Sequence, residues 1–429
     1  MAEDFAHVID ELEWRGLIGQ TTGLEALRET LDSGPVTFYC GFDPTAASLH
    51  HGHLVAVKVM RHLQMAGHHP IVLVGGATGL VGDPRAKGER VLNERDVVAG
   101  WASSLKAQLE SLLDFEGPAA AVTVNNLDWT QQMTAVDFLR DLGKYFRVGT
   151  MLNKDIVARR LASEEGISYT EFSYQILQAN DYLELFRRYG CTLEVGGNDQ
   201  WGNMTGGMDL IRKVEGESVH VLTNPLITKS DGTKFGKSEG GAIWLNPELL
   251  SPYGFYQFWL NTADADVIRM LKVFTFLSKA EIEALEAELE ANPGARGAQR
   301  RLAQEVTAWV HGEEAMKRVE QASAVLFGKE DPHVLDAQTL KDATKELMNE
   351  TSIEVGTTLV DAAVALGLEA SKAAARRTIA SGGLYLNNEK VASDEQTITA
   401  ADVLAGGLVL VRRGRKKQAV ASVSGATEE

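Results

Sequence analysis

Cysteine is scarce in this chain of 429 residues, and so are the signals of a membrane or secreted protein. Cys40 and Cys191 are the only cysteines, too few for a disulfide framework or a cysteine-based zinc cluster. No apolar run approaches the roughly 18 residues that a membrane-spanning helix needs. The start, MAEDFAHVIDELEWRG, is acidic and therefore unlike a secretory signal or a transit peptide. These absences predict a cytoplasmic protein.

Basic residues are outnumbered by acidic ones, 42 against 59, which gives a net charge of −17. Such a charge disfavours binding to nucleic acid. The imbalance is uneven, however, because residues 353–417 carry 9 basic and 7 acidic side chains. The basic residues there cluster in SKAAARR (371–377) and RRGRKK (412–417). A solvated charged surface and a nucleic-acid-binding face both remain open for these clusters.

Apolar runs in the first half of the chain predict a parallel sheet. A buried strand at residues 35–41, a helix at 53–65 and a strand at 70–76 make a βαβ unit. Further strands are expected at 121–126, 191–197 and 220–227. Residues 1–247 are therefore predicted to form a doubly wound, Rossmann-like α/β domain, in which ligands bind at the carboxyl ends of the strands.

Strand patterns fade after residue 247, and the remainder is predicted to contain smaller parts. Long helical patterns over 265–294 and 297–321 indicate a helical domain at 248–327. Residues 328–352 are polar and weakly patterned, which is typical of a linker with short structure. The rest is predicted to be a compact α+β module at 353–418, with helices in 359–368 and 371–383 and strands at 384–388 and 407–413, followed by a disordered tail at 419–429.

Three histidines crowd the stretch GFDPTAASLHHGHLV, residues 41–55, between the first predicted strand and helix. A glycine-flanked loop that enters a helix is a phosphate-binding place, because the helix N-terminus offers free N–H groups and a positive dipole end. His50 and His53 flank Gly52, which allows a ligand close to the backbone, and Thr45 adds a hydroxyl. A zinc site would need further ligands that no nearby histidine or cysteine pair supplies. Phosphate binding is therefore favoured over metal binding.

Polar residues also follow other predicted strands and one helix. YQILQAND places Tyr174, Gln178 and Asp181 on one helix face, where burial would require a polar ligand or network. GGATGLVGDPRAKGER, residues 75–90, contains Asp83 among cations, and GGNDQWGN adds Asp199 and Gln200 after a strand. TKFGKS, residues 233–238, offers two lysines that suit a polyphosphate. Taken singly, each of these segments could be an ordinary surface loop or capped turn.

Together these segments resemble the bacterial tyrosyl-tRNA synthetase family, within class I of the aminoacyl-tRNA synthetases. HHGH is similar to the His-Ile-Gly-His motif of that class, and KFGKS to its Lys-Met-Ser-Lys-Ser motif. The resemblance extends through YCGFDPTAASLHHGHL, GGATGLVGDP, EFSYQILQANDYL and GGNDQWGN, and residues 353–418 resemble an S-four-type RNA-binding domain. One departure is His51, at a position that is usually apolar. We expect its side chain to point away from ATP, into the helix packing.

The resemblance implies a reaction in two steps. Tyrosine would attack the α-phosphate of ATP, accompanied by Mg²⁺, to form tyrosyl-adenylate and diphosphate, and the tyrosyl group would then pass to the 3′ end of its tRNA. The substrate carboxylate is itself the nucleophile, so catalysis would consist of positioning and charge stabilisation. The residues implied for this task are Thr45, His50, His53, Lys87, Arg90, Lys234, Lys237 and Ser238.

The resemblance also implies binding residues and partners. Helices of the 248–327 region would read the anticodon, and an insertion near 125–165 would form a homodimer. No protein-bound metal is expected. The tyrosine pocket would consist of Tyr39, Asp83, Tyr174, Gln178, Asp181 and Gln200. ATP would contact Cys40, Gly41, Asp43, His50, Gly52, His53, Asp199, Lys234 and Lys237, and RNA would contact Lys372, Arg376, Arg377, Arg412, Arg413 and Arg415.

Three other functions fit the sequence less well. A tryptophanyl enzyme is disfavoured because Tyr39 and Asp181 suit a phenol. A small-molecule nucleotidylyltransferase would share the histidine motif but would not need a helical domain and an RNA-binding module. A non-catalytic RNA-binding paralogue could lose His50, Asp83 or Lys234 at no cost, yet all three are present.

Overall fold

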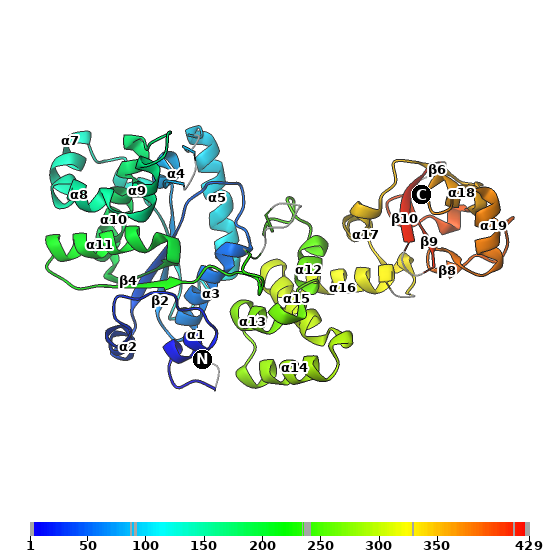
Figure 1. The fold of residues 1–429 in the computed structure, drawn as a ribbon, viewed down its shortest axis with the longest axis horizontal. Helices are drawn as coiled ribbons and strands as arrows, with labels where there is room; N and C mark the ends of the chain where they lie inside the picture. Colours follow the sequence, from blue (N-terminus) through cyan, green and yellow to red (C-terminus); the bar gives the residue numbers. More distant parts are fainter. Residues whose placement is uncertain are drawn as a thin grey trace. The chain divides into compact units, whose positions relative to one another are not determined.

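The structure, a computed structural model, describes residues 4–85, 88–89, 92–233, 235, 242–327, 330–414 and 417–424. The chain divides into two compact units (Figure 1). Unit 1 comprises Met1–Leu249 and Thr262–Glu305, and unit 2 comprises Leu250–Asn261 and Val306–Glu429. Among the described residues, no helix combines the length and the apolar character that crossing a membrane requires.

Unit 1 is built on a five-stranded parallel sheet with the order β3-β2-β1-β4-β5. The chain runs outward from β1 in one direction and then resumes on the other side with β4, so the strand order reverses between β1 and β4. This confirms the doubly wound, Rossmann-like class, and such a reversal is where these sheets bind ligands. The strands are β1 (Thr37–Phe42), β2 (His69–Val74), β3 (Val122–Asn125), β4 (Cys191–Gly197) and β5 (His220–Asn224), all where the sequence predicts them.

Helices cover this sheet and form its core. Tyr39 and Ile71 of the sheet share one hydrophobic core with Tyr182 of α10 and Leu210 of α11. Helix α10 begins where the side chain of Ser168 caps it and ends at Gly190, whose φ of 63° suits glycine. The helices before residue 125 are α1 (Val8–Trp14), α2 (Leu24–Asp32), α3 (His51–Met65), α4 (Thr78–Val81) and α5 (Arg95–Leu112), and those after β3 include α10 (Tyr169–Tyr189) and α11 (Trp201–Val214).

The insertion near 125–165 is made of short elements. FLRDLGKYFRVGTMLNK, predicted to offer one apolar helical face, is interrupted: a π-helical turn at Phe138–Leu142 and a 3-10 turn at Gly143–Tyr145 precede the next α-helix. Apolar side chains nevertheless reach its surface. Its α-helices are α6 (Leu127–Thr130), α7 (Ala135–Asp137), α8 (Val148–Leu152) and α9 (Asp155–Leu161).

The helices predicted at 248–327 are present, but both long patterns are broken. The first is interrupted where Ser278 caps a new helix in a reciprocal capping box with Glu281, and the second at Gly312, whose φ is 87°. These helices do not form a unit of their own, because α13 and α14 belong to unit 1, α12 and α16 to unit 2, and α15 spans the boundary. They are α12 (Pro252–Leu260), α13 (Asp264–Phe274), α14 (Lys279–Ala291), α15 (Gly297–His311) and α16 (Glu313–Phe327).

The C-terminal module of unit 2 contains a second five-stranded sheet, with the order β6-β10-β9-β7-β8. The two predicted helices and two predicted strands are present. The module has its own apolar core, which includes Leu359, Ile379, Leu384 and Val409. Its elements are β6 (Ile353–Glu354), α18 (Leu359–Ala365), α19 (Lys372–Ala380), β7 (Leu384–Leu386), β8 (Glu389–Lys390), β9 (Leu408–Arg413) and β10 (Lys417–Ser424).

One expectation for this end of the chain needs correction, and another becomes more specific. Residues 419–424, predicted to be disordered, belong to strand β10, which pairs antiparallel with β9 from Lys417 to Ser422. Its alanines and serines carry little strand propensity, and the neighbouring strand supplies the hydrogen bonds. The predicted linker 328–352 contains α17 (Ala337–Thr344), whose Leu340 shares a core with Leu410.

Candidate active site

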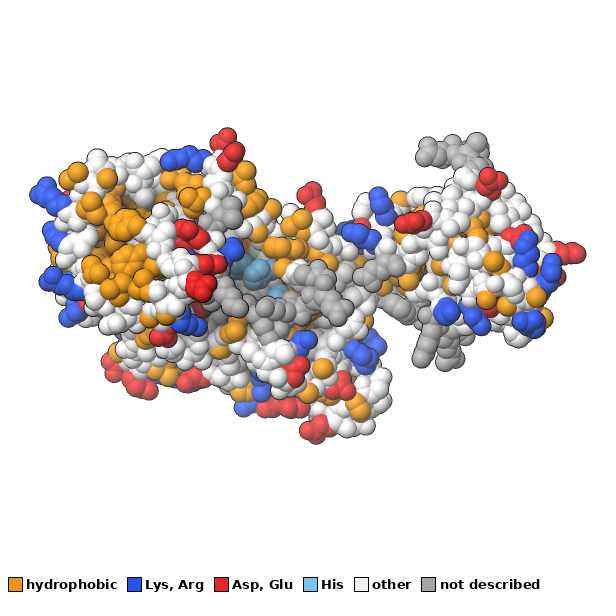
Figure 2. Space-filling model, turned by 45° about the horizontal axis from the view of Figure 1, so that its top comes forward, with side chains coloured by type: hydrophobic (Ala, Val, Ile, Leu, Met, Phe, Trp, Pro, Cys, Tyr) orange, Lys and Arg blue, Asp and Glu red, His pale blue; other side chains and the backbone are white. Residues whose placement is uncertain are grey.

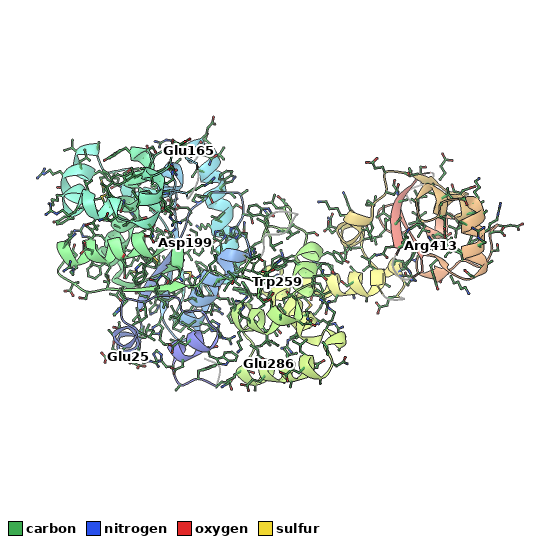
Figure 3. The ribbon with its side chains drawn as sticks, viewed as in Figure 1. Glu25, Glu165, Asp199, Trp259, Glu286 and Arg413 are labelled. Carbon is green, nitrogen blue, oxygen red and sulfur yellow. The ribbon has the colours of Figure 1, made fainter. Side chains whose placement is uncertain are left out.

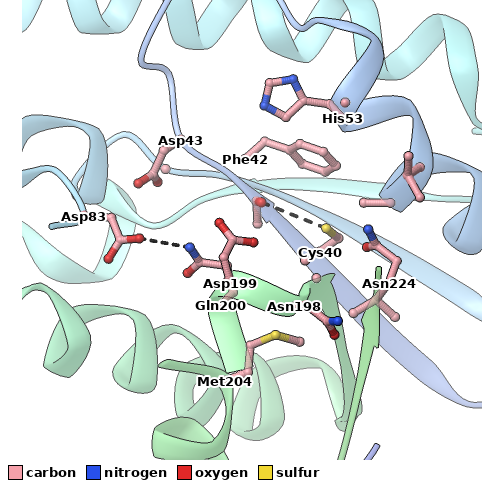
Figure 4. A pocket seen from close by; sticks show the side chains of 18 of the residues that line it. Cys40, Phe42, Asp43, His53, Asp83, Asn198, Asp199, Gln200, Met204 and Asn224 are labelled. Atoms are coloured by element: carbon pink, nitrogen blue, oxygen red, sulfur yellow. Dashed lines mark hydrogen bonds between the residues drawn. The ribbon is translucent and has the colours of Figure 1, made fainter. Parts of the chain in front are cut away.

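A cavity of about 580 Å³ lies in unit 1, lined mainly by residues at the carboxyl ends of β1 and β4 and at the start of α3 (Figure 4). This is the place that the reversal of strand order predicts. The described residues contain no group of three or more histidine, cysteine, aspartate or glutamate side chains arranged to hold a metal ion. The predicted site residues that line the cavity are Tyr39, Cys40, Gly41, Asp43, Thr45, His50, Gly52, His53, Asp83, Tyr174, Gln178, Asp181, Asp199 and Gln200.

Five predicted catalytic residues cannot be placed. Lys87, Arg90, Lys234, Lys237 and Ser238 lie outside the described residues. Their assignment remains a prediction.

The histidine motif caps helix α3. His50 is the N-cap: its Nδ1 accepts from the Gly52 N–H at 3.1 Å, and His53 Nδ1 accepts from the His50 N–H at 3.1 Å. The two rings lie with their centroids 4.0 Å apart. Because each Nδ1 accepts a hydrogen bond, each neutral ring carries its proton on Nε2 and can donate from there. The motif therefore combines a helix N-terminus with two imidazole donors, an arrangement suited to phosphate.

Glycine at position 52 leaves room for the His50 ring in this cap. A Cβ atom there would lie 2.9 Å from His50 Cε1. The spacing His-x-Gly-His is thus explained by the cap itself, before any ligand is considered.

His51, the departure from the family pattern, is buried at 7% exposure. Its Nε2 lies 3.0 Å from the carbonyl oxygen of Phe235, the described residue of the KFGKS segment, and the two rings meet nearly edge-on at 5.8 Å. Its backbone N–H donates to Ile243. The side chain is buried, as expected, but it also lines the cavity. His51 therefore joins the histidine motif to the segment that carries the second signature.

Two carboxylates at the cavity are held by neutral donors. Asp43 accepts from the hydroxyls of Thr78 at 2.6 Å and Tyr174 at 2.7 Å. Asp83 accepts from Gln200 Nε2 at 2.9 Å (Figure 4) and from Asn203 Nδ2 at 3.2 Å. Tyr174, predicted to bind tyrosine, thus also orients Asp43, predicted to bind ATP. Two acidic groups that line one cavity suit a ligand ammonium.

Asp181 lines the cavity and is 2% exposed. Its carboxylate accepts from Asn126 Nδ2 and from Trp129 Nε1, each at 2.9 Å. Burial raises the pKa of Asp181 to about 8, although both hydrogen bonds act to lower it. Sequence reasoning missed Asn126 and Trp129, and the position of Asn126 at the end of a predicted strand was an available signal.

Glu194 was also missed. It is 3% exposed, lines the cavity and accepts from Gln178 Nε2 at 3.2 Å. Burial raises its pKa to about 7, while the neighbouring Tyr39 hydroxyl and the Gln178 amide oppose that rise. The signal was a charged residue inside the otherwise apolar strand CTLEVGG. Buried carboxylates with raised pKa values are frequent at functional sites.

Lys154 approaches the site from the insertion. Its Nζ donates to the Gly202 carbonyl at 2.6 Å, and burial lowers its pKa to about 8 while the nearby Asp83 opposes that change. No pattern in the sequence distinguishes this lysine. Cys40 also lines the cavity, and burial raises the pKa of its thiol, which keeps it neutral beside Gly41.

The predicted RNA-binding cations lie in unit 2, and three of the six make ion pairs within their own module. Lys372 bonds Asp361 at 2.6 Å and Arg376 bonds Asp394 at 3.3 Å. Arg413, labelled in Figure 3, bonds the buried Glu369 at 2.8 Å.

The other three predicted cations differ from one another. The Arg412 guanidinium lies 4.3 Å from the centre of the Tyr385 ring. Arg377 is exposed, and Arg415 lies outside the described residues. Among the described cations of this module, Lys372, Arg376, Arg377 and Arg413 are exposed and Arg412 is half-buried.

Two family models match the chain. The family described as tRNA synthetases class I (W and Y) matches residues 31–328, and the tyrosine–tRNA ligase SYY-like C-terminal domain matches residues 339–421. The chain belongs to the class I tyrosine–tRNA ligase family. It is therefore an aminoacyl-tRNA synthetase, and the second model separates it from the tryptophan-specific members.

Individual relatives agree. Tyrosine–tRNA ligase of Bifidobacterium longum (strain DJO10A) is 57% identical over 424 residues, 96% of each chain. That of Streptomyces griseus subsp. griseus is 56% identical over 417 residues, 97% of this chain and 98% of the relative. A C-terminally truncated mitochondrial tyrosyl-tRNA synthetase of Aspergillus nidulans superimposes with a TM-score of 0.69 at 32% identity, covering 76% of this chain and 95% of the other.

Proposed function

We propose that the cavity of unit 1 is where this ligase activates L-tyrosine with ATP, giving tyrosyl-adenylate and diphosphate, before the tyrosyl group passes to the 3′ end of tRNA(Tyr). The observation that carries the proposal is that two groups of residues line one cavity. The buried side chains of Tyr39 and Asp181 suit a phenol, and the histidine-capped N-terminus of α3 suits phosphates. One end suits the amino acid and the other suits the phosphates.

The residues at the amino-acid side of the cavity would bind both polar groups of tyrosine, the phenol and the ammonium. Asp181 and Tyr39 would hydrogen-bond the phenol, and Asp83, Tyr174 and Gln178 would hold the ammonium group. Gln200 would line the pocket through its bond to Asp83. Phenylalanine would leave the buried Asp181 and Tyr39 without their partner, a basis of rejection that is known for tyrosine-specific synthetases.

The phosphate end would act through charge rather than through a protein nucleophile. The tyrosine carboxylate attacks the α-phosphorus, the bond to the β-phosphate oxygen breaks, and diphosphate leaves with the negative charge. Donors from His50 and His53, with Thr45, would stabilise that charge. The nucleotide would lie along Cys40, Gly41, Asp43, Gly52 and Asp199, and Lys87, Arg90, Lys234, Lys237 and Ser238, with the Mg²⁺ that accompanies ATP, would add charge.

The tRNA would engage the rest of the chain. The helices of the 248–327 region would read the anticodon, and the C-terminal module would bind structured RNA through its exposed cations, with Arg377 the most available. Exchange of a carboxylate partner for a phosphate would let Lys372 and Arg376 take part.

A homodimer through the insertion is part of the proposal. Val136, Leu139 and Val148 are 66%, 59% and 61% exposed. Hydrophobic side chains gather over the end of unit 1 that carries α7–α9 (Figure 2). Sedimentation of the wild type and of Leu139→Lys tests this: a dimer that dissociates in the variant supports it, and a monomeric wild type contradicts it.

The activity is tested by ATP–diphosphate exchange in the presence of tyrosine, phenylalanine or tryptophan, with Mg²⁺ and without tRNA. Exchange with tyrosine alone is expected. Exchange with tryptophan would overturn the roles of Tyr39 and Asp181, and no exchange from folded protein would refute the catalytic assignment.

A further inference from the structure

We propose that Glu194 is a positioning residue of the tyrosine pocket, which orients the Gln178 amide so that its carbonyl oxygen accepts from the substrate ammonium. The inference rests on the proposed function, because it assumes that tyrosine occupies this cavity. It assigns a role to a residue that neither signature motif contains.

The sheet places Glu194 beside the other tyrosine-binding groups. Glu194 on β4 pairs in register with Tyr39 on β1, so the two side chains project from the same face of neighbouring strands. Gln178 reaches the same point from α10. Tyr39 and Glu194 are 1% and 3% exposed, so the contacts of their polar atoms are set by the protein or by a ligand, not by bulk water.

The hydrogen bond to Gln178 decides which way the amide faces. While its carboxylate is ionised, Glu194 offers only acceptors, so Gln178 turns its NH₂ group toward Glu194, and Nε2 donates to Oε1 at 3.2 Å. The Gln178 carbonyl oxygen is then directed away from Glu194. That oxygen is buried and has no hydrogen-bond partner among the described residues.

An unpaired buried acceptor is costly, and the cost is recovered when a donor arrives. The donor that suits Gln178 Oε1, in a cavity also lined by the Asp83 carboxylate, is an ammonium. Glu194 Oε2 likewise makes no hydrogen bond of ordinary geometry to another described residue, although the Tyr39 hydroxyl lies near enough to lower the Glu194 pKa. The local surplus of acceptors and negative charge therefore matches the cationic end of an amino acid.

A Glu194→Gln substitution would remove this preference while keeping the size. The substituted side chain can donate as well as accept, so the Gln178 amide could turn over and present its NH₂ group to the ammonium. Glu194 acts through Gln178 and need not touch the substrate, which separates it from Asp83 and Asp181.

The test is equilibrium binding of three ligands to the full chain and to Glu194→Gln. Tyrosine and tyramine carry the ammonium, whereas 3-(4-hydroxyphenyl)propionate lacks it and keeps the phenol and carboxylate. We expect Glu194→Gln to weaken tyrosine and tyramine by about tenfold, the scale of one lost hydrogen bond to a charged group. Binding of the propionate should change by less than about twofold.

The same binding measurement in the Gln178→Ala variant distinguishes a positioning role of Glu194 from a purely structural one. There, Glu194→Gln should have no further effect on tyramine, because the mediating amide is gone. Glu184→Gln is the matched control: Glu184 lies on the same helix as Gln178 but bonds Arg188 at the surface.

Equal weakening of all three ligands, additive losses in the double variant, or unchanged tyramine binding would each overturn the inference. A wild-type chain that binds none of the three ligands would instead refute the proposed function.

Discussion

The cavity of unit 1 and the C-terminal module of unit 2 handle charge in opposite ways. In the cavity, the carboxylates of Asp181 and Glu194 are buried and held by neutral donors, and burial raises their pKa values to about 8 and about 7. In the module, Lys372 and Arg376 are exposed and paired with acidic side chains. Exposed ion pairs contribute only about 0–1 kcal/mol, whereas a misplaced buried polar group costs several times more.

The difference suggests two kinds of recognition. Buried groups that are already oriented can discriminate one hydroxyl or one ammonium, because a wrong ligand leaves them unpaired. Weakly paired surface cations can exchange a carboxylate for a phosphate at little cost, which suits binding by charge and shape. Substitutions in the two regions should therefore differ greatly in their effects.

The largest effect is expected from Asp181→Asn. Asparagine would turn an NH₂ group toward the donors of Asn126 or Trp129, so tyrosine-dependent exchange should fall by on the order of a hundredfold or more. Asp209→Asn, at the surface of α11, is the control and should leave exchange unchanged. Near-normal exchange in Asp181→Asn would contradict the expectation that substitutions of buried charged groups have larger effects than substitutions of exposed ones.

The same substitution should alter the pH dependence of stability. The Asp181 pKa is about 8 in the folded chain and near 4 in the unfolded chain, so its contribution is fully present below about pH 4 and is lost as the pH rises toward 8. The free energy of unfolding should therefore fall less steeply between about pH 5 and 8 in Asp181→Asn. Denaturant unfolding at several pH values measures this, and parallel curves would contradict it.

His50→Ala should have the next largest effect. Loss of an imidazole donor should lower the rate of adenylate formation by on the order of a hundredfold, with little change in tyrosine affinity. His50→Asn, which can still cap α3, separates helix stability from catalysis, because it should restore thermal stability but not the rate. Weakened tyrosine binding with an unchanged rate would refute the assigned role.

A smaller effect is expected at His51. His51→Leu keeps an apolar volume but loses the bond to the Phe235 carbonyl, so the KM for ATP should rise by about three- to tenfold while the KM for tyrosine stays the same. His51→Gln can place a donor near the position of Nε2 and should recover most of the loss. Equal ATP kinetics in all three proteins would show that the contact has no catalytic consequence.

The smallest effect is expected in the module. Arg377→Ala should weaken tRNA binding only a few-fold and lower the salt slope by about one if Arg377 contacts one phosphate. Arg413→Ala should instead destabilise the module, because it would leave the buried Glu369 without its ionic partner. Filter binding at several salt concentrations and thermal unfolding separate the two outcomes. If Arg377→Ala destabilised the module and Arg413→Ala only weakened tRNA binding, the roles assigned to the two arginines would be reversed.

Local patterns in the sequence were sufficient to predict the strands and helices that carry the active site. The strands of unit 1 are short apolar runs, the cap of α3 is contained within four residues, and Tyr174, Gln178 and Asp181 share a helix face because of helical spacing. Each of these features depends on residues close together in the chain. A reversal of strand order is also implied by the doubly wound class that the sequence predicts.

Tertiary structure decided the features that depend on distant residues. The partners of Glu194 lie on β1 and α10, the bond from His51 reaches Phe235, and Lys154 meets the site from the insertion. Strand β10 forms because the edge of β9 supplies its hydrogen-bond partners. The alanines and serines of β10 do not by themselves indicate a strand. Hydrophobic period and capping are local and can be read along the chain, but burial, pKa and hydrogen-bond partners depend on which elements meet, and only the folded structure determines that.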